Sequence, residues 1–390
     1  MLTAMSTIAT VSFTACPDYR AASACLTDLF GPLGGLSRFV QPGSRVLIKP
    51  NLLSDRPPDS AVVTHPLLVQ AIVRAVRDCG GRPAIGDSPA SALKFASVLE
   101  KTGYRALCED EGVPVVRFEE SGSRFVSRNG FSIPMAAPVL DADVVINAPK
   151  AKTHVLTTLT AAVKNMYGVI PGYRKAMFHK QFPSSREFGR LLAAVTRAVP
   201  PTLNVLDAVT GMQGNGPSGG NPVHLGFLAA SEDAFALDMA LCRVLGVRTE
   251  TVPYLAGLKA AFGGDDGATP PDGAADIRIR LAGTPASTLC PAGGFEVPGT
   301  ARARLIPARL VKLLGPLIWI RPRMNERCIR CGQCVRACPA SALALESAGP
   351  PRLYPERCIG CCCCHEVCPV KAVDMRQSPL LNLLRGGRML

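Results

Sequence analysis

The chain has 390 residues, 47% of them hydrophobic, and a formal net charge of +13. That length and apolar content predict two or three domains with a sizeable core. Most of the charge lies in residues 301–390, which hold 15 Lys and Arg against 5 Asp and Glu. Aromatic residues make up only 5% of the chain and interleave with no basic face, so the sequence argues against nucleic-acid binding.

The two ends of the chain bear on location. Met1–Cys16 lacks the basic and apolar regions of a signal peptide, which favours the cytoplasm. Leu305–Ile320 is the most apolar stretch, but it contains Arg309 and Lys312 and is too short to cross a bilayer. We expect an amphipathic helix packed on protein there, with a membrane surface as the alternative. Six scattered cysteines are expected to be buried free thiols of a reducing compartment: Cys16, Cys25, Cys79, Cys108, Cys242 and Cys290.

Strand-like and helix-like segments alternate along residues 1–262. Strands are expected at Arg45–Lys49, Val113–Phe118, Asp143–Asn147, Leu203–Asp207 and His224–Ala230. Helices are expected at Ser91–Lys101, Arg186–Val199 and Ala234–Leu245, and from an N-cap at Thr64 through Cys79. Asn129-Gly130 predicts a two-residue hairpin turn within Phe125–Ile133. The alternation predicts an α/β domain with a mostly parallel sheet and helices on both faces.

The remaining chain divides into three further segments. Residues 263–325 are expected to be a linker, because residues 263–300 are rich in Gly, Pro and Asp, with one strand suggested at Asp276–Leu281. Residues 326–376 form a small cysteine-rich domain, and residues 377–390 form a tail.

Polar residues collect where the predicted strands end, and ligands of open parallel sheets bind beyond those ends. Several lysines and the backbone N–H groups of a glycine-rich loop suit an anionic ligand, a carboxylate or a phosphate. No Walker or Rossmann fingerprint is present, so nucleotide binding has little support. The candidate binding residues are Lys49, Asn51, Asp87 with Ser88, Asn147, Lys150, Asn165, Asp207, Gly214, Gly216 and Gly219.

Three residues of these loops are candidate catalytic groups: His154, Lys152 and Lys164. His154 is the best candidate for proton transfer, because only histidine titrates near neutrality without perturbation. A hydrogen-bonded structural histidine is the alternative, and each lysine taken singly is more often a solvated surface charge. His65 is expected to be architectural, and His179 and His224 are weaker candidates.

Eight cysteines near the C-terminus follow the bacterial ferredoxin spacing twice, each run closing with Cys-Pro. In two-cluster ferredoxins the fourth cysteine of each run ligates the other cluster. The spacing therefore predicts two [4Fe-4S] clusters and an electron-transfer protein. One ligand set is Cys328, Cys331, Cys334 and Cys368, and the other is Cys358, Cys361, Cys364 and Cys338.

Other interpretations of these cysteines fit less well. A zinc ribbon shows two CxxC pairs with a longer spacer, and a disulfide framework suits short secreted domains. Cys362 and Cys363 exceed the ligand count. We expect them to be apolar bystanders, with redox or ligand-exchange chemistry as the alternative. The arginines near the runs are expected to offset the negative charge of the clusters.

Several of these segments resemble the domain of unknown function 362 family over about residues 8–262. The resemblance rests on Lys49-Pro50-Asn51, Gly86-Asp87-Ser88-Pro89, Pro149-Lys150-Ala151-Lys152-Thr153-His154, Val163-Lys164-Asn165-Met166-Tyr167-Gly168, and Asp207 with Gly214-Asn215-Gly216-Pro217. The cysteine runs with Cys364-His365-Glu366 resemble the ferredoxin module of its longer members. The resemblance implies an α/β domain joined to an electron-transfer module, and it implies no reaction.

The leading hypothesis is an iron–sulfur oxidoreductase that delivers electrons from a small donor or a redox partner protein to an anionic ligand in the α/β domain. A tethered electron donor has a high effective concentration at a neighbouring site. An electron carrier or maturation partner for another enzyme, with a binding domain that performs no chemistry, is the alternative. A third hypothesis is a non-redox enzyme, such as an isomerase, with clusters in a regulatory or structural role.

Overall fold

The computed structural model describes residues 8–90, 92–263, 276–291, 293–299 and 319–379. The predicted amphipathic helix at 305–320 falls outside these ranges apart from Trp319 and Ile320, and so does most of the predicted tail. Within the described ranges no helix has both the length and the apolar character needed to span a bilayer.

A large mixed sheet forms the centre of the molecule, in the order β12-β13-β1-β11-β10-β7-β2-β3-β4, with β8 and β9 branching from β10. Three of its strand pairs are antiparallel, β11 with β1, β11 with β10, and β9 with β8. The other pairs are parallel, so the prediction of a mostly parallel sheet is confirmed. Its strands are β1 Ile8–Ala15, β2 Arg45–Pro50, β3 Arg82–Asp87, β4 Val115–Arg117, β7 Val144–Ala148, β8 Lys150–His154, β9 Thr158–Thr160, β10 Leu203–Gln213, β11 Asn221–Ser231, β12 Ala260–Phe262 and β13 Ile277–Gly283.

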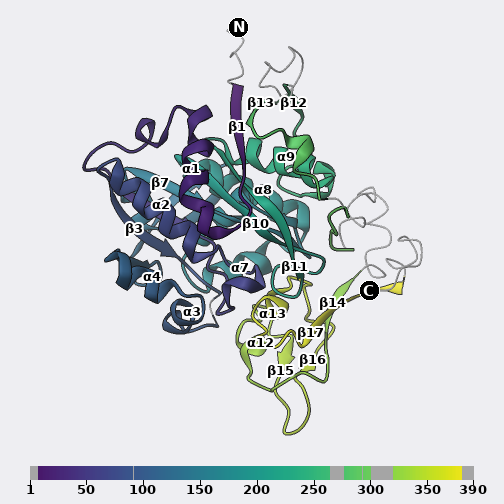
Figure 1. Ribbon diagram of the computed structural model, residues 1–390. Coiled ribbons are helices and arrows are strands. Elements are labelled where there is room, and N and C mark those ends of the chain that lie inside the picture. Colours follow the sequence, from purple (N-terminus) through teal and green to yellow (C-terminus); the bar gives the residue numbers. More distant parts are fainter. Residues whose placement is uncertain (1–7, 91, 264–275, 292, 300–318, 380–390) are drawn as a thin grey trace.

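Helices cover both faces of this sheet (Figure 1). One core contains apolar side chains of α1 and α2, and the other contains those of α8 and α9. The helices are α1 Ala22–Phe30, α2 Pro66–Asp78, α3 Phe95–Lys101, α4 Tyr104–Glu111, α5 Ala137–Asp141, α6 Ala162–Asn165, α7 Arg174–Gln181, α8 Ser185–Ala198 and α9 Ala234–Leu245. A β-hairpin of β5 Ser123–Arg128 and β6 Phe131–Ala136 turns at Asn129 and Gly130, both with positive φ as predicted.

Two local predictions are wrong. Thr64 does not cap α2; His65 does, because its Nδ1 accepts from Leu67 N at 3.3 Å, while the Thr64 hydroxyl donates to the Ala148 carbonyl at 2.7 Å. Residues 150–154, expected as a loop, form β8 and pair with β10 and β9. The strand suggested at Asp276–Leu281 is present as β13, a parallel partner of β1 in the main sheet.

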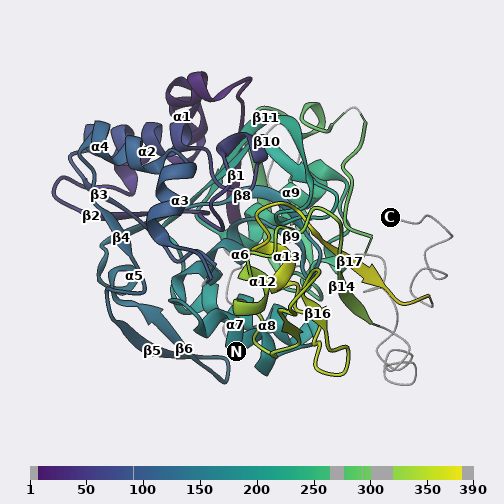
Figure 2. The ribbon, with the colours of Figure 1, turned by 90° about the horizontal axis from the view of Figure 1, so that it is seen from below.

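The C-terminal module, residues 319–379, is a small α+β unit with an internal repeat. It contains β14 Ile320–Met324 paired with β17 Val373–Gln377, β15 Leu343–Ala344 paired with β16 Arg352–Leu353, and the short helices α12 Gln333–Arg336 and α13 Cys363–Glu366. Figures 1 and 2 show the module against one end of the large sheet, with α13 on the side that faces it. The β15–β16 hairpin lies at the far end of the module (Figure 1).

Candidate functional site

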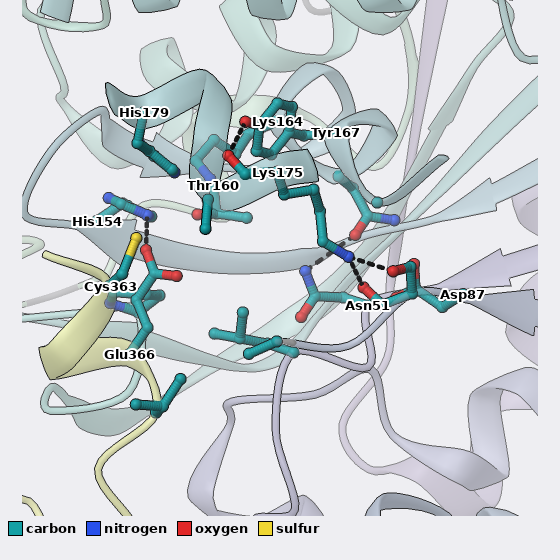
Figure 3. Close-up of a pocket in the computed structure, with 18 of the residues that line it drawn as sticks. Asn51, Asp87, His154, Thr160, Lys164, Tyr167, Lys175, His179, Cys363 and Glu366 are labelled. Atoms are coloured by element: carbon teal, nitrogen blue, oxygen red, sulfur yellow. Dashed lines mark hydrogen bonds and ion pairs between the residues drawn. The ribbon is translucent and has the colours of Figure 1, made fainter. Parts of the chain in front are cut away.

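A cavity of about 100 Å³ lies between the α/β domain and the C-terminal module. That volume holds several water molecules or a small ligand. Seven of the predicted site residues line it: Lys49, Asn51, Asp87, Lys152, His154, Lys164 and Asn165. Ser88 lines it too, and the module contributes Ala337, Cys363, Glu366 and Val367. Figure 3 shows His154, Cys363 and Glu366 at one end of the cavity and Asn51 and Asp87 at the other.

Lys49 and Asp87 form a closed ion pair at the end of β2 and β3. Their Nζ and Oδ1 atoms are 2.8 Å apart, and both side chains are buried. Asp87 Oδ2 accepts from the Leu52 backbone N–H at 2.8 Å. A Cβ at Gly168 would come within 2.3 Å of Asp87 Oδ1, so only glycine permits this pair beside it. Burial lowers the pKa of Lys49 and Asp87 opposes that shift, so the pair adds no net charge to the cavity.

A chain of buried amides fixes the position of Lys152. The contacts run from Lys152 Nζ to Asn51 Oδ1 at 2.9 Å, Asn51 Nδ2 to Asn165 Oδ1 at 2.9 Å, Asn165 Nδ2 to Asn147 Oδ1 at 2.8 Å, and Asn147 Nδ2 to Asn204 Oδ1 at 2.8 Å. Every donor in this chain faces an acceptor, which is the arrangement that buried polar groups require. Asn147, expected as a ligand residue, is instead a support behind the cavity wall.

Three cations in the cavity, Lys152, Lys164 and Lys175, lack a carboxylate partner at ion-pair distance among the described residues. Lys152 Nζ donates to Asn51 Oδ1 and to the Val62 carbonyl, at 2.9 and 2.6 Å. Lys164 Nζ lies 5.4 Å from the ring centre of Tyr167 and 5.9 Å from that of Phe188, and its side chain makes no hydrogen bond within the described part of the chain. Burial lowers the pKa of Lys152 and of Lys164, that of Lys152 well below its ordinary value. Uncompensated charge in such a place is costly.

His154 meets Glu366 across the boundary between the two parts of the chain. His154 Nε2 and Glu366 Oε1 are 2.9 Å apart (Figure 3). The Leu156 N–H donates to His154 Nδ1 at 3.0 Å, so the neutral ring carries its proton on Nε2, toward the carboxylate. Burial and Lys164 lower the His154 pKa to about 3. Burial alone would raise the pKa of Glu366, but His154 and Lys164 lower it to about 2. At neutral pH the contact therefore joins a neutral imidazole to a carboxylate.

Further cavity residues lie outside the predicted binding and catalytic sets, although His179 was a weaker candidate. Lys175 Nζ, on α7, donates to the Ser88 hydroxyl and to the carbonyls of Ser88 and Pro89. Burial lowers the pKa of Lys175 to about 8. His179 stacks on Phe188 with ring centres 4.2 Å apart, and burial lowers its pKa to about 4. The Thr160 hydroxyl, also on the wall, is buried without a hydrogen-bond partner among the described residues. Glu366 and Cys363 lie within the second cysteine run, whose spacing predicts cluster ligands but not that these two residues line the cavity.

Lys150 and Asp207 lie outside the cavity in a pair of their own. Lys150 Nζ and Asp207 Oδ2 are 2.9 Å apart, and both side chains are fully buried. Tyr19 OH donates to Asp207 Oδ1 at 2.9 Å and accepts from Lys150 Nζ at 2.8 Å, while His65 N–H donates to Asp207 Oδ2 at 2.9 Å. Because the charge of Lys150 is paired with Asp207 and neither residue lines the cavity, the pair supports the fold.

The glycine-rich loop after β10 faces the C-terminal module. A Cβ at Gly216 would lie 2.1 Å from the Thr153 carbonyl oxygen, and one at Gly219 would lie 2.4 Å from His365 Cε1. His365 Nε2 is 2.9 Å from the Asn215 carbonyl oxygen, and Ser218 Oγ donates to the Glu366 carbonyl at 2.8 Å. Gly214, with a φ of 75°, donates to the Glu296 carbonyl at 2.7 Å. These glycines therefore permit close approach of protein, and only Pro217 of this loop lines the cavity.

The eight cysteines of the two runs surround two separate cavities in the module. Cys328, Cys331, Cys334 and Cys368 line one, and Cys338, Cys358, Cys361 and Cys364 line the other. The fourth cysteine of each run thus lies with the first three of the other run. The Ala342 N–H donates to Cys338 Sγ at 3.2 Å and the Ala372 N–H to Cys368 Sγ at 3.1 Å, which suits thiolates. Both cavities therefore fit cysteine-ligated clusters.

The two extra cysteines have different surroundings. Cys362 has a φ of 67° and caps α13, at the position where Gly332 with a φ of 72° caps α12 in the first run. It lines the second cysteine cavity. Cys363 is buried, points into the main cavity and lies near His154 and Glu366 (Figure 3).

Comparison with known proteins agrees with this architecture. Residues 46–243 match the family model described as Domain of unknown function (DUF362). The chain belongs to the DUF362 family. Residues 327–372 match a 4Fe-4S dicluster domain, so this DUF362 chain carries an iron–sulfur module and is an iron–sulfur electron-transfer protein.

One related sequence and one solved structure are similar to this DUF362 chain. The chain is 39% identical over 254 residues to the thylakoid-associated protein sll1697 of Synechocystis sp. (strain ATCC 27184 / PCC 6803 / Kazusa), covering 64% of this chain and 78% of the relative. It also matches the lactate racemase apoprotein from Thermoanaerobacterium thermosaccharolyticum, at 12% identity and a TM-score of 0.40, over 66% of this chain. That match spans 59% of the racemase chain.

The two buried lysine pairs of the DUF362 domain lead to a stability prediction. Lys150→Met leaves Asp207 buried and uncompensated, so the free energy of unfolding should fall by about 3–5 kcal/mol. Lys101 pairs with Asp55 at 2.8 Å but is 57% exposed, so Lys101→Met should change the free energy of unfolding by about 1 kcal/mol or less. Urea unfolding of both variants measures the difference. Equal losses would show that the Lys150 pair is not a buried support.

Proposed function

We propose that the protein is an oxidoreductase that reduces an anionic small molecule bound in the cavity. Two [4Fe-4S] clusters, held by the two sets of four cysteines, would supply single electrons. The observation that supports an anionic ligand is that the buried Lys152 and the half-buried Lys164 have no carboxylate partner, since a bound anion would offset both charges. Among the other charged groups of the cavity, Lys49 is paired with Asp87, and Glu366 contacts the neutral His154 ring. Lys175 donates only to neutral oxygens of Ser88 and Pro89, so the lysines of the cavity still outnumber its carboxylates.

The two lysines have distinct roles in this proposal. Lys152 is held by the amide chain, so it positions one end of the anion. Lys164 Nζ has no hydrogen bond within the described residues and a lowered pKa, so it can both bind the anion and give up a proton. Electrons added to the ligand increase its negative charge, and proton transfer from Lys164 Nζ offsets that increase.

His154 has a positioning role in place of the proton donation that the sequence suggested. Its only proton at neutral pH is directed at Glu366, and its pKa of about 3 makes the imidazolium form rare. The contact holds Glu366 of the module at the cavity, on the same short helix as Cys363. His154 therefore fixes the module to the site where the ligand binds.

The expected location remains the cytoplasm. All sixteen cysteines are free, including those outside the two runs, and this favours a reducing compartment.

Replacing Lys164 tests the anion site. We expect Lys164→Met to slow reoxidation of the reduced holoprotein about 100-fold or more when the oxidant is a small molecule with a reducible group, such as a carbonyl, and a carboxylate or phosphate group, because one cation at the developing charge is lost. Visible absorbance of the clusters measures the rate anaerobically. Lys180→Met, at an exposed position on the neighbouring helix α7, is the control and should leave the rate unchanged. Equal rates for Lys164→Met and the unaltered protein would contradict the proposal.

Iron analysis of paired cysteine variants tests the two-cluster assignment. Reconstituted protein should hold roughly eight irons per chain, and Cys338→Ala and Cys361→Ala should each leave roughly four. Because these two cysteines line one cavity, the double variant should also leave roughly four. Cys334→Ala with Cys338→Ala should leave almost none, although both residues belong to the first run.

Cys362→Gly is the control for the iron measurements. Glycine suits the positive φ at this position, so the variant should keep the full iron content. The assignment fails if Cys334→Ala with Cys338→Ala retains half of the iron.

A further inference from the structure

The two cysteine cavities of the module differ in what surrounds them. Cys363 and Ala337, which adjoin ligands of the second set, face the main cavity, and so does Val367, which adjoins Cys368 of the first set. Only the first set contains an exposed cysteine, Cys331, and Ile329, on the wall of the same cysteine cavity, is 61% exposed. Both sets therefore adjoin the ligand site, and the first set also reaches the protein surface.

An exposed apolar patch lies over the loop that contains Ile329 and Cys331. Six large hydrophobic side chains are exposed within the described residues, and the two in the module are Ile329 and Leu345. Leu345 follows β15, at the far end of the module from the large sheet (Figure 1), and its Cδ1 would be 3.2 Å from a Cβ at Gly332. Because Gly332 adjoins Cys331, both side chains border the exposed cysteine. Exposed apolar side chains beside a redox centre indicate contact with another molecule.

Cations surround this patch. Arg327, Arg330 and Arg336 are all exposed. Arg336 Nη1 donates to the Cys331 carbonyl at 3.3 Å, and Arg330 Nη2 donates to the carbonyls of Glu346 and Ser347 at 2.8 and 2.9 Å. These hydrogen bonds go to neutral carbonyls, and no described carboxylate lies at ion-pair distance from Arg327, Arg330 or Arg336.

The nearby carboxylates do not cancel this charge. Glu326 is exposed and offsets one of the three arginines, and Glu346 already lies 3.8 Å from Arg352. The face therefore keeps a positive excess around an apolar centre. We define the Ile329 face as Arg327, Ile329, Arg330, Cys331, Arg336 and Leu345.

We propose that the Ile329 face binds an acidic electron-carrier protein, the donor that loads the module. An apolar centre ringed by cations complements a carrier whose redox centre lies among carboxylates, and such charge complementarity speeds and orients transient encounters. The face is small, as interfaces between redox proteins are. This inference rests on the proposed function, because it supplies the electrons that the cavity uses.

Titration of the complete holoprotein with an acidic flavodoxin tests the proposal. The Ile329 side chain is mostly exposed, so its replacement need not disturb the loop. We expect Ile329→Glu to raise the Kd about tenfold or more, and Ile329→Lys to raise it less. Phe125→Glu, at a position 66% exposed on the distant β5–β6 hairpin, should leave the Kd unchanged. Binding should weaken as ionic strength rises.

The outcomes separate this proposal from the proposed function. Reduction of Ile329→Glu by dithionite, followed by reoxidation with cavity ligands, should match the unaltered protein, since the small reductant needs no docking face. Slow reoxidation in Lys164→Met but not in Ile329→Glu would support the cavity as the ligand site, independently of the docking face. No flavodoxin binding, equal Kd values for Ile329→Glu and Phe125→Glu, or tighter binding of basic cytochrome c would overturn the docking proposal. Self-association that Ile329→Glu abolishes would overturn it too, by assigning the face to a second copy.

Discussion

The cost of burying a cation without a partner is the constraint on which the site depends. Lys49 and Lys150 avoid this cost because Asp87 and Asp207 lie within 2.9 Å of their ammonium groups. Lys152 and Lys164 have no carboxylate at that distance, although Asp87 and Glu366 line the same cavity. Stored destabilisation of this kind is common where a ligand completes the electrostatics. It connects the packing of the α/β domain to what the domain can bind.

The cavity is complete only when both parts of the chain are present. The α/β domain supplies the lysines and amides, and α13 supplies Glu366 and Cys363. Contacts on either side hold the module in place, because Arg56 Nη2 donates to the Cys368 carbonyl at 2.7 Å and Lys371 Nζ to the Gly220 carbonyl at 3.0 Å. The same helix thus borders the main cavity and the second cysteine cavity, so a ligand bound there would lie beside the second cluster that we propose.

Local sequence patterns predicted the parts of the structure that depend on local physics. A few neighbouring residues are enough to predict the strand at Arg45–Lys49, the Asn129-Gly130 turn and the cluster-binding cysteines. The roles of Lys150 and Lys152 could not be separated in this way, because both lie on β8, two residues apart. Their difference arises from partners far along the chain, Asp207 for one and Asn51 for the other. Glu366, which meets His154 from 212 positions away, leaves no local trace.

Identification of the molecule held in the cavity tests the central claim most directly. Anaerobically purified protein can be denatured and its released small molecules analysed by mass spectrometry, for the unaltered chain and for Lys164→Met. The account predicts a stoichiometric anion, a carboxylate or a phosphate, that is lost from the variant. A neutral or cationic molecule retained equally by both proteins would contradict it.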